Sequence, residues 1–217
     1  MGESREPDRA ILFVDGNNWY SFMKKCGVKD PMILSYATIS TKLLGPRTWI
    51  ATQYYIGAVK QEGNLSLYAE QRRFLASLTA EDSRITVHLG RVERREEVNP
   101  LADEVESYLR QPHLNIGEDV RNHLRILAKG QRLLRQYKEK AVDVKLAVDM
   151  VEQADRYDAA YLLSADGDFT PAVEAVRAKG KKVFAVAPKP GFSTALQQRA
   201  NSFIQLDRDW FADCNRP

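Results

Sequence analysis

Two apolar segments that lie far apart in the chain both lead into acidic side chains. Residues 11–14 run into Asp15, and residues 161–163 are followed shortly by Asp166 and Asp168. Both segments have the composition of buried strands, and open parallel sheets bind ligands beyond the carboxyl ends of their strands. The three acids are therefore expected to converge. Because carboxylates that share a site repel one another unless a cation joins them, the pattern predicts a metal site.

A fourth acid, Asp143, stands near the start of a predicted helix. Oxygen ligands without His or Cys nearby favour Mg²⁺ or Mn²⁺ over zinc. Such a cluster leaves coordination positions for a phosphate and a water, which suits phosphodiester hydrolysis. Each acid also has a simpler explanation, namely turn chemistry at the strand ends and helix capping at Asp143. The four acids together favour the metal site over these separate explanations.

Bulk composition is that of an ordinary globular chain. The 217 residues are 44% hydrophobic and 28% charged, with a net charge of +3. One domain with an insertion is expected at this length. No apolar run approaches the roughly 20 residues that span a bilayer, and the first residues lack the apolar core of a secretory signal, so we expect a cytoplasmic protein. The two cysteines, Cys26 and Cys214, and three histidines argue against a disulfide framework and a zinc site.

Strand and helix patterns alternate along most of the chain. Predicted strands cover residues 10–15, 49–57, 85–90, 159–164, 182–187 and 202–206. Predicted helices begin after Asn18 and cover residues 36–44, 62–78, 143–154, 171–179 and 193–201. The alternation predicts an α/β fold with a parallel sheet and right-handed crossovers. We expect a flexible N-terminus over residues 1–8, one domain over residues 9–207 and a tail over residues 208–217.

Residues 91–140 break the alternation and are predicted to form a helical insertion. Their first part is acidic and rich in turn residues, whereas residues 121–140 hold seven Lys or Arg against one acid. If residues 121–140 form one helix, five basic side chains share a face: Arg121, Arg125, Lys129, Arg132 and Arg135. Gly130 is a candidate interruption of that helix. This face is predicted to bind nucleic acid, because a nuclease must hold a polyanion beside its own acids. A solvated face or a homodimer contact is the alternative.

Three separated motifs carry a family resemblance: Phe13–Trp19, Lys140–Asp149 and Leu163–Phe169. Together they resemble the NYN domain family, the LabA-like branch of the PIN-like nuclease superfamily, over about residues 9–90 and 138–207. The resemblance implies a PIN-like three-layer α/β/α sandwich with a central, mainly parallel sheet. It also implies a ribonuclease site that depends on Mg²⁺ or Mn²⁺.

The same resemblance implies roles for individual residues. Asp15 matches the first-strand metal ligand, and Asn18 matches the amide that orients Asp15 or a phosphate. Asp143, Asp166 and Asp168 match the remaining acids, with three supporting candidates: Ser164, Asn17 and Asp149. The helix geometry places Asp149 away from Asp143, on a side that we expect to be solvated. Two alanines depart from the family pattern, Ala141 and Ala165, where glycine is usual.

These observations predict a metal-dependent endoribonuclease acting on single-stranded or structured RNA. Three aromatic residues near the acids are candidates for stacking on an unpaired base, although core packing is an alternative for them: Trp19, Tyr20 and Phe169. A phosphatase with an aspartyl nucleophile would need a second Asp where Asn17 stands, so that class is disfavoured. A catalytically silent RNA-binding or regulatory module, or a scaffold acting through the insertion, remains an alternative.

Overall fold

Two structural units make up the chain in the computed structural model. Residues 1–91 and 140–217 form the larger unit, and residues 92–139 form the insertion unit. The structure describes residues 8–59, 65–98, 100–111, 113–114, 116–130, 133–188 and 193–216, with the backbone alone for residues 92–98, 133–140 and 188. Each unit is considered by itself below.

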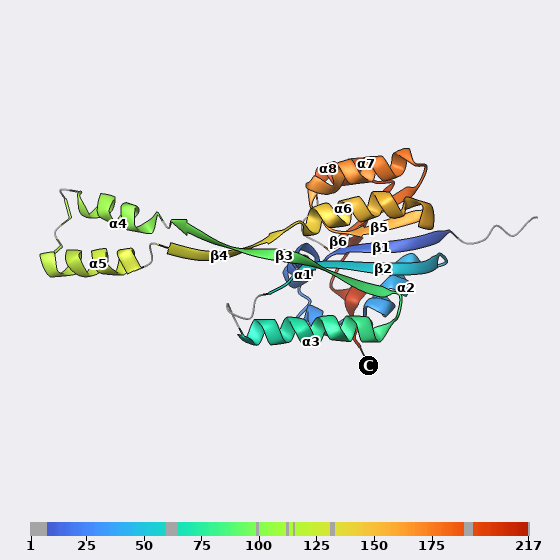
Figure 1. Cartoon of the computed structure of the whole chain (residues 1–217), viewed down its shortest axis with the longest axis horizontal. Helices are drawn as coiled ribbons and strands as arrows, with labels where there is room; N and C mark the ends of the chain where they lie inside the picture. Colours follow the sequence, from blue (N-terminus) through green and yellow to red (C-terminus); the bar gives the residue numbers. More distant parts are fainter. Residues whose placement is uncertain are drawn as a thin grey trace, which may run out of the picture. The chain divides into compact units, whose positions relative to one another are not determined.

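A parallel sheet forms the centre of the larger unit (Figure 1). Its strands are β1 (Arg9–Asp15), β2 (Thr48–Gly57), β3 (Ile85–Val98), β5 (Ala159–Leu163), β6 (Lys182–Pro188) and β7 (Ser202–Leu206). A seventh strand, β4 (Leu133–Lys140), is the neighbour of β3, and all of it but Lys140 belongs to the insertion unit. Their order across the sheet is β4-β3-β2-β1-β5-β6-β7. All neighbouring pairs from β3 to β7 are parallel, as the alternation of strands and helices predicts.

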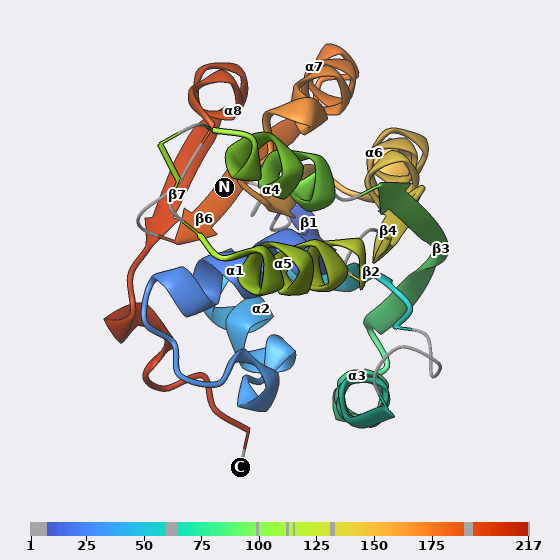
Figure 2. The same cartoon turned by 90° about the vertical axis from the view of Figure 1, so that its left-hand side faces the viewer.

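Helices cover both faces of the sheet (Figures 1 and 2). On one face lie α1 (Gly16–Lys25), α2 (Tyr36–Leu44) and α3 (Leu65–Glu81), and on the other lie α6 (Val142–Glu152), α7 (Thr170–Ala178) and α8 (Thr194–Arg199). Short 3₁₀ turns are η1 (Pro31–Ile33), η2 (Gln153–Arg156), η3 (Gly167–Phe169) and η4 (Asp209–Phe211). The predicted three-layer α/β/α sandwich is confirmed.

Strand β1 shows why two cores form. Leu12 and Val14 pack into the core under α1 and α2, whereas Ile11 and Phe13 pack into the core under α6 and α7. Residues 10–15 are all buried, because successive side chains point to opposite faces and both faces are covered. The strand therefore has a continuous apolar sequence that stops at Asp15, the position from which a site can be built.

The insertion unit differs from the prediction. Its helices are α4 (Leu101–Leu109) and α5 (Glu118–Gly130), and residues 133–140 form strand β4. One continuous helix over residues 121–140 is therefore wrong, and the break falls at Gly130, the candidate interruption. The helix ends at Gly130, since glycine is a poor helix former, and Arg135 lies on a strand. Arg132 and the side chain of Arg135 lie outside the described residues.

The segment after β7 packs onto the α1 and α2 side of the sheet. Phe211 and Cys214 are buried in that core, and the backbone N–H of Ser35 donates to the carbonyl of Cys214 at 2.7 Å. The Lys42 ammonium lies 2.5 Å from the Asp213 carboxylate. In the part of the chain that the structure describes, no helix is both long and apolar enough to cross a membrane.

Candidate active site

The strand order reverses between β1 and β5, and the predicted acids stand at this switch point. Strands β2 and β3 follow β1 to one side, and β6 and β7 follow β5 to the other. Crevices form beyond the carboxyl ends of strands at such a reversal. Asp15 is the last residue of β1, and Ser164 comes directly after β5, whose Leu163 pairs with Val14. The carboxyl ends of β1 and β5 therefore lie side by side in the sheet.

Asp15 is buried and held by hydrogen bonds from both strand ends. Its side chain is the N-cap of α1, with Oδ1 accepting from the backbone N–H of Asn18 at 3.3 Å. Its other oxygen, Oδ2, accepts from the Ser164 hydroxyl at 2.9 Å. The Asn18 side chain accepts from the N–H of Ala165 at 3.2 Å. Asn18 and Ser164 therefore fix the Asp15 carboxylate against the segment after β5.

Gly16 is required by close packing at the same turn. A Cβ at this position would lie 2.7 Å from the carbonyl oxygen of Tyr55 and 2.7 Å from the ring of Tyr54. Backbone atoms cannot move aside as the end of a flexible side chain can. The Asp15-Gly16 pair therefore combines a capping acid with the residue that lets α1 start against β2.

The segment after β5 folds back on itself. The N–H of Asp166 donates to the Ser164 hydroxyl at 3.1 Å, and the Asp166 carboxylate accepts from the N–H of Asp168 at 3.0 Å. Asp166 thereby caps η3 and is half-buried, while Asp168 is exposed. A Cβ at Gly167 would lie 2.8 Å from the Ser193 hydroxyl, so glycine also suits this turn.

Asp143 lies in the first turn of α6 and is exposed. The residue that precedes the helix, Ala141, has φ 68° and ψ 3°, a left-handed conformation that glycine adopts readily and alanine does not. The family resemblance implies glycine at this position. The chain instead places alanine in a backbone conformation that is strained for it.

The four acids influence one another electrostatically. Burial raises the pKa of Asp15 to about 6, hydrogen bonds from Ser164 and Asn18 oppose that shift, and Asp143 and Asp166 add to it. Loss of solvation raises the pKa of Asp143 as well, with further contributions from Asp166 and Asp168. Like charges raise carboxylate pKa values in this way only when they are close. Asp143 is therefore electrostatically linked both to Asp15 and to the two acids that follow β5.

The donor set fits a hard divalent cation, although the acids are not drawn together. Among the described residues, no group of three or more Asp, Glu, His or Cys side chains is placed closely enough to hold a metal ion. Within the same residues, no Lys, Arg or His forms an ion pair with Asp15. A buried carboxylate without a positive partner is costly, and all its neighbouring acids offer oxygen ligands.

Asp149 is buried, so the expectation of a solvated side chain is wrong. Its carboxylate accepts from the Tyr55 hydroxyl at 2.8 Å and lies 2.5 Å from the Lys145 ammonium. Tyr55 stacks on His88 with ring centroids 4.5 Å apart, and burial lowers the pKa of His88. Asp149 therefore belongs to a network beside α6 that sequence reasoning missed. The spacing of Lys145 and Asp149, four residues apart on a helix, is the signal that could have revealed the pair.

Two of the predicted stacking residues are core residues. Trp19 and Phe169 are buried in opposite cores, whereas Tyr20 is half-buried and Asn17 is exposed. Core packing of the helix start accounts for Trp19, which contacts Phe211 edge to face. Of the three aromatic candidates, Tyr20 is the one with an accessible side chain.

Two of the predicted basic contacts bond to their own unit. The Arg121 guanidinium donates to three backbone carbonyls, that of Leu109 at the end of α4 and those of Leu114 and Ile116 before α5. Arg125 pairs with Glu106 at 2.9 Å and with Glu118 at 3.4 Å. Lys129 is exposed. Arg121 and Arg125 thus have structural roles within the insertion unit.

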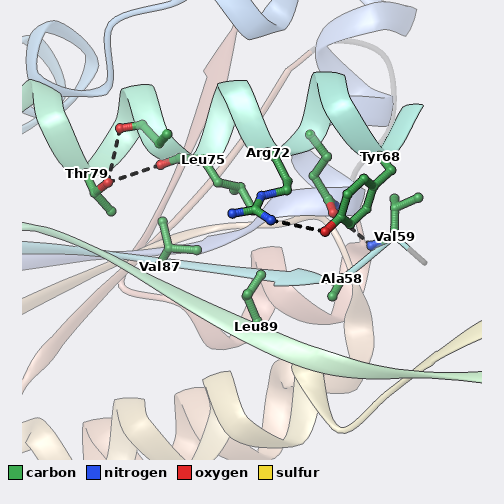
Figure 3. Close-up of a pocket in the computed structure, with 10 residues that line it drawn as sticks. Ala58, Val59, Tyr68, Arg72, Leu75, Thr79, Val87 and Leu89 are labelled. Atoms are coloured by element: carbon green, nitrogen blue, oxygen red, sulfur yellow. Dashed lines mark hydrogen bonds between the residues drawn. The ribbon is translucent and has the colours of Figure 1, made fainter. Parts of the chain in front are cut away.

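Two hollows of similar size lie on opposite faces of the sheet in the larger unit. One, of about 470 Å³, is lined by Tyr55, His88 and the start of α6 at Val142 and Lys145. The other, of about 480 Å³, lies between α3 and β3 and is lined largely by apolar side chains, with a hydrogen bond from Arg72 to Tyr68 (Figure 3). No carboxylate lines the second hollow. The first is the one that adjoins the helix bearing Asp143.

A three-layer sandwich with acids beyond its central strands is the architecture of the PIN-like nuclease superfamily. The sequence matches the NYN domain over residues 9–207, and the chain belongs to the NYN domain family. It is 24% identical to the low amplitude and bright protein LabA of Synechococcus elongatus, over 97% of this chain and 91% of that protein.

Two further similarities cover different extents of the chain. An uncharacterized protein of Methanocaldococcus jannaschii is 38% identical over 74 residues, which are 33% of this chain and 31% of that protein. A crystal structure of a protein of unknown function from Vibrio parahaemolyticus superposes with a TM-score of 0.59 at 19% identity, covering 97% of this chain and 99% of the other. The structural likeness supports the fold alone.

Proposed function

We propose that this protein is a metal-dependent endoribonuclease whose site is the acid cluster at the β1 and β5 ends. The observation that carries the proposal is Asp15, a buried carboxylate whose pKa is raised by two neighbouring acids, Asp143 and Asp166, and which has no cationic partner among the described residues. Burying such a group is unfavourable unless a ligand compensates for it. Membership of the NYN family supports a nuclease-like reaction at this position.

In this proposal Asp15, Asp166 and Asp168 would hold Mg²⁺ or Mn²⁺, with Asp143 beside them. Bound divalent ions would polarise the scissile phosphate and lower the pKa of an attacking water. Asp143, with its raised pKa, would orient that water and accept its proton. Asn18 and Ser164 keep the Asp15 carboxylate fixed by hydrogen bonds, and both act as positioning residues.

RNA binding in this proposal would use surfaces beside the acids and basic side chains of the insertion. The hollow next to α6 has the size of a nucleotide site and is lined by His88 and the exposed Arg91. Lys129 is the accessible member of the predicted basic face. Arg121 and Arg125 would contact RNA only by giving up bonds within their own unit.

The test is cleavage of a labelled single-stranded RNA and its DNA equivalent in Mn²⁺, in Mg²⁺ and in EDTA. We expect cleavage that needs a divalent ion and that is faster on RNA. Asp166→Asn should remove the activity while the circular dichroism spectrum stays unchanged. Absence of cleavage in every metal, or cleavage that survives in EDTA, would contradict the proposal.

The second candidate is a catalytically silent RNA-binding or regulatory module. It is favoured by the spacing of the acids, since the described residues contain no ready-made metal site. Salt-dependent RNA retention without cleavage, equal in wild type and Asp166→Asn, would establish this reading in place of the nuclease.

A further inference from the structure

The hollow beside α6 carries positive charge, although the acids of the proposed active site stand next to it. Its lining holds two cationic side chains, Arg91 and Lys145, and no carboxylate. Lys145 lies 2.5 Å from the Asp149 carboxylate, which neutralises much of its charge. Arg91 is exposed and forms no ion pair with the described residues. Arg91 therefore gives the hollow an uncompensated positive charge that attracts an anion.

Strand register places this hollow beside the acid cluster. Asp15 on β1 pairs with Tyr55 on β2, and Tyr55 pairs with His88 on β3. Neighbouring strands are about 4.8 Å apart, so the backbone of His88 lies ~10 Å from that of Asp15 along the carboxyl edge of the sheet. The first turn of α6 borders both places, because Val142 lines the hollow and Asp143 is linked electrostatically to the other acids. A polyanion held at the acids thus has the hollow within reach of its next unit.

His88 supplies a flat, uncharged ring to the hollow. Its imidazole stacks on Tyr55, with ring centroids 4.5 Å apart and 13° between the ring planes. Its Nε2 lies 2.5 Å from Oε1 of the buried Gln53, and this contact holds the ring in one orientation. Burial lowers the pKa of His88, so the ring is neutral near pH 7. A fixed aromatic ring of this kind is a platform on which a nucleobase stacks.

The size and lining of the hollow select a nucleotide rather than a small anion. The volume of about 470 Å³ lies within the range of sites that enclose small organic molecules. A phosphate alone would leave the imidazole and the apolar lining from Val87 and Val142 without a partner. A nucleobase accounts for the ring and the apolar lining, and the phosphate that is joined to it through the ribose accounts for Arg91.

We propose that the hollow binds the nucleotide next to the scissile phosphate, with its base stacked on His88 and its phosphate on Arg91. The inference rests on the proposed nuclease function, because the acids define which phosphate is cleaved. Stacking does not read the edge of a base, so this position accepts all four bases. Arg91 and His88 are binding residues in this arrangement and take no part in the chemical step.

The phosphate contact is tested by the salt dependence of RNA binding. Labelled single-stranded RNA is bound to the Asp166→Asn protein, so that the RNA stays intact during the measurement. Each phosphate contact contributes about 0.7 to the slope of log affinity against log salt for single strands. Arg91→Gln in this background should weaken binding and reduce the slope by about 0.7. The matched control, Arg73→Gln, changes an exposed arginine of α3 on the opposite face of the sheet and should leave the slope unchanged.

The base contact is tested with two probes, the same RNA and an oligomer of abasic sugar phosphates of equal length. His88→Ala should weaken RNA binding about tenfold and leave binding of the abasic oligomer unchanged. His88→Phe should retain RNA binding, because it keeps an aromatic ring. Arg91→Gln should weaken the binding of both probes. If His88→Ala does not fold, as judged by circular dichroism, His88→Gln takes its place.

Cleavage assays separate this inference from the nuclease proposal. In the active protein, Arg91→Gln should raise KM and leave kcat within about twofold, since the phosphate that it contacts does not react. Unchanged binding in both Arg91→Gln and His88→Ala would overturn the nucleotide site even if the wild type cleaves RNA. So would a slope that Arg73→Gln reduces equally, or a His88→Phe protein that binds RNA as weakly as His88→Ala. The expected binding results without any cleavage would support the hollow as an RNA site and contradict the nuclease alone.

Discussion

Replacing Asp15 by Asn removes a buried carboxylate that the protein disfavours as an anion. Burial raises the pKa of Asp15 from the usual 3.8 to about 6. Hydrogen bonds from Ser164 and Asn18 lower the pKa and so cancel part of the rise that burial causes. Since one pKa unit corresponds to about 1.4 kcal/mol, keeping Asp15 ionised costs the folded chain about 3 kcal/mol. An amide has nearly the same shape and avoids that cost.

The effect of the substitution depends on pH in a definite direction. Because the folded chain binds the Asp15 proton more tightly than the unfolded chain does, the penalty is absent below about pH 4 and complete above about pH 6. The amide that replaces the carboxylate forms a weaker hydrogen bond with the Ser164 hydroxyl, and this loss costs about 1 kcal/mol. We expect Asp15→Asn to raise the free energy of unfolding by about 2 kcal/mol at about pH 8, and to lower it slightly at about pH 4.

Urea unfolding without divalent ions at the two pH values measures this effect. Asp158→Asn is the matched control, because Arg9 lowers the pKa of Asp158 to about 2. That variant should lose stability near neutral pH, by about 1 kcal/mol or less since the ion pair is partly exposed. An Asp15→Asn protein less stable than the wild type at about pH 8 would refute the reasoning from burial.

Three further substitutions test the surroundings of the site. Ala141→Gly relieves a left-handed alanine and should raise the free energy of unfolding by about 1 kcal/mol in thermal melts; a loss of stability would contradict the strained backbone. Gly16→Ala should lower the free energy of unfolding by about 1–3 kcal/mol in urea, because the added Cβ meets the backbone of Tyr55. The control Gly117→Ala should have little effect, since the space around that position is open. Lys145→Met should lower the free energy of unfolding by about 2 kcal/mol, because Asp149 is then buried without a cation. Adding Asp149→Asn should restore part of that loss. An unchanged midpoint of chemical unfolding in Lys145→Met would show that the ion pair is unimportant.

Much of the fold could be predicted from the sequence because local and tertiary preferences agree. The apolar run before Asp15 is buried on both faces, and its length and strand propensity match a central parallel strand. The order of strands and helices then limits the topology through the handedness rule. The sequence also places Asp15 and Asp166 after two predicted strands, and the structure pairs these strands with Val14 opposite Leu163.

Other features depend on contacts that spacing alone does not reveal. Asp149 looks solvated on a helical wheel, yet the Tyr55 hydroxyl from β2 reaches it and compensates for its burial. Trp19 sits beside the acids in sequence but turns into the core against Phe211. In the insertion, Gly130 was a candidate break, but the strand that follows it was not expected. The amphipathic spacing of residues 121–140 does not show that residues 133–140 pair with another strand.

The central claim is that Asp15 is part of a metal-dependent ribonuclease site. The most direct measurement is the cleavage rate of one labelled single-stranded RNA in Mn²⁺ by wild type, Asp15→Asn and Asp158→Asn. The last variant changes an acid that precedes β5, at the opposite end of the strand from Asp166. We predict a loss of at least about a hundredfold for Asp15→Asn and an unchanged rate for Asp158→Asn. Equal rates for wild type and Asp15→Asn would contradict the claim.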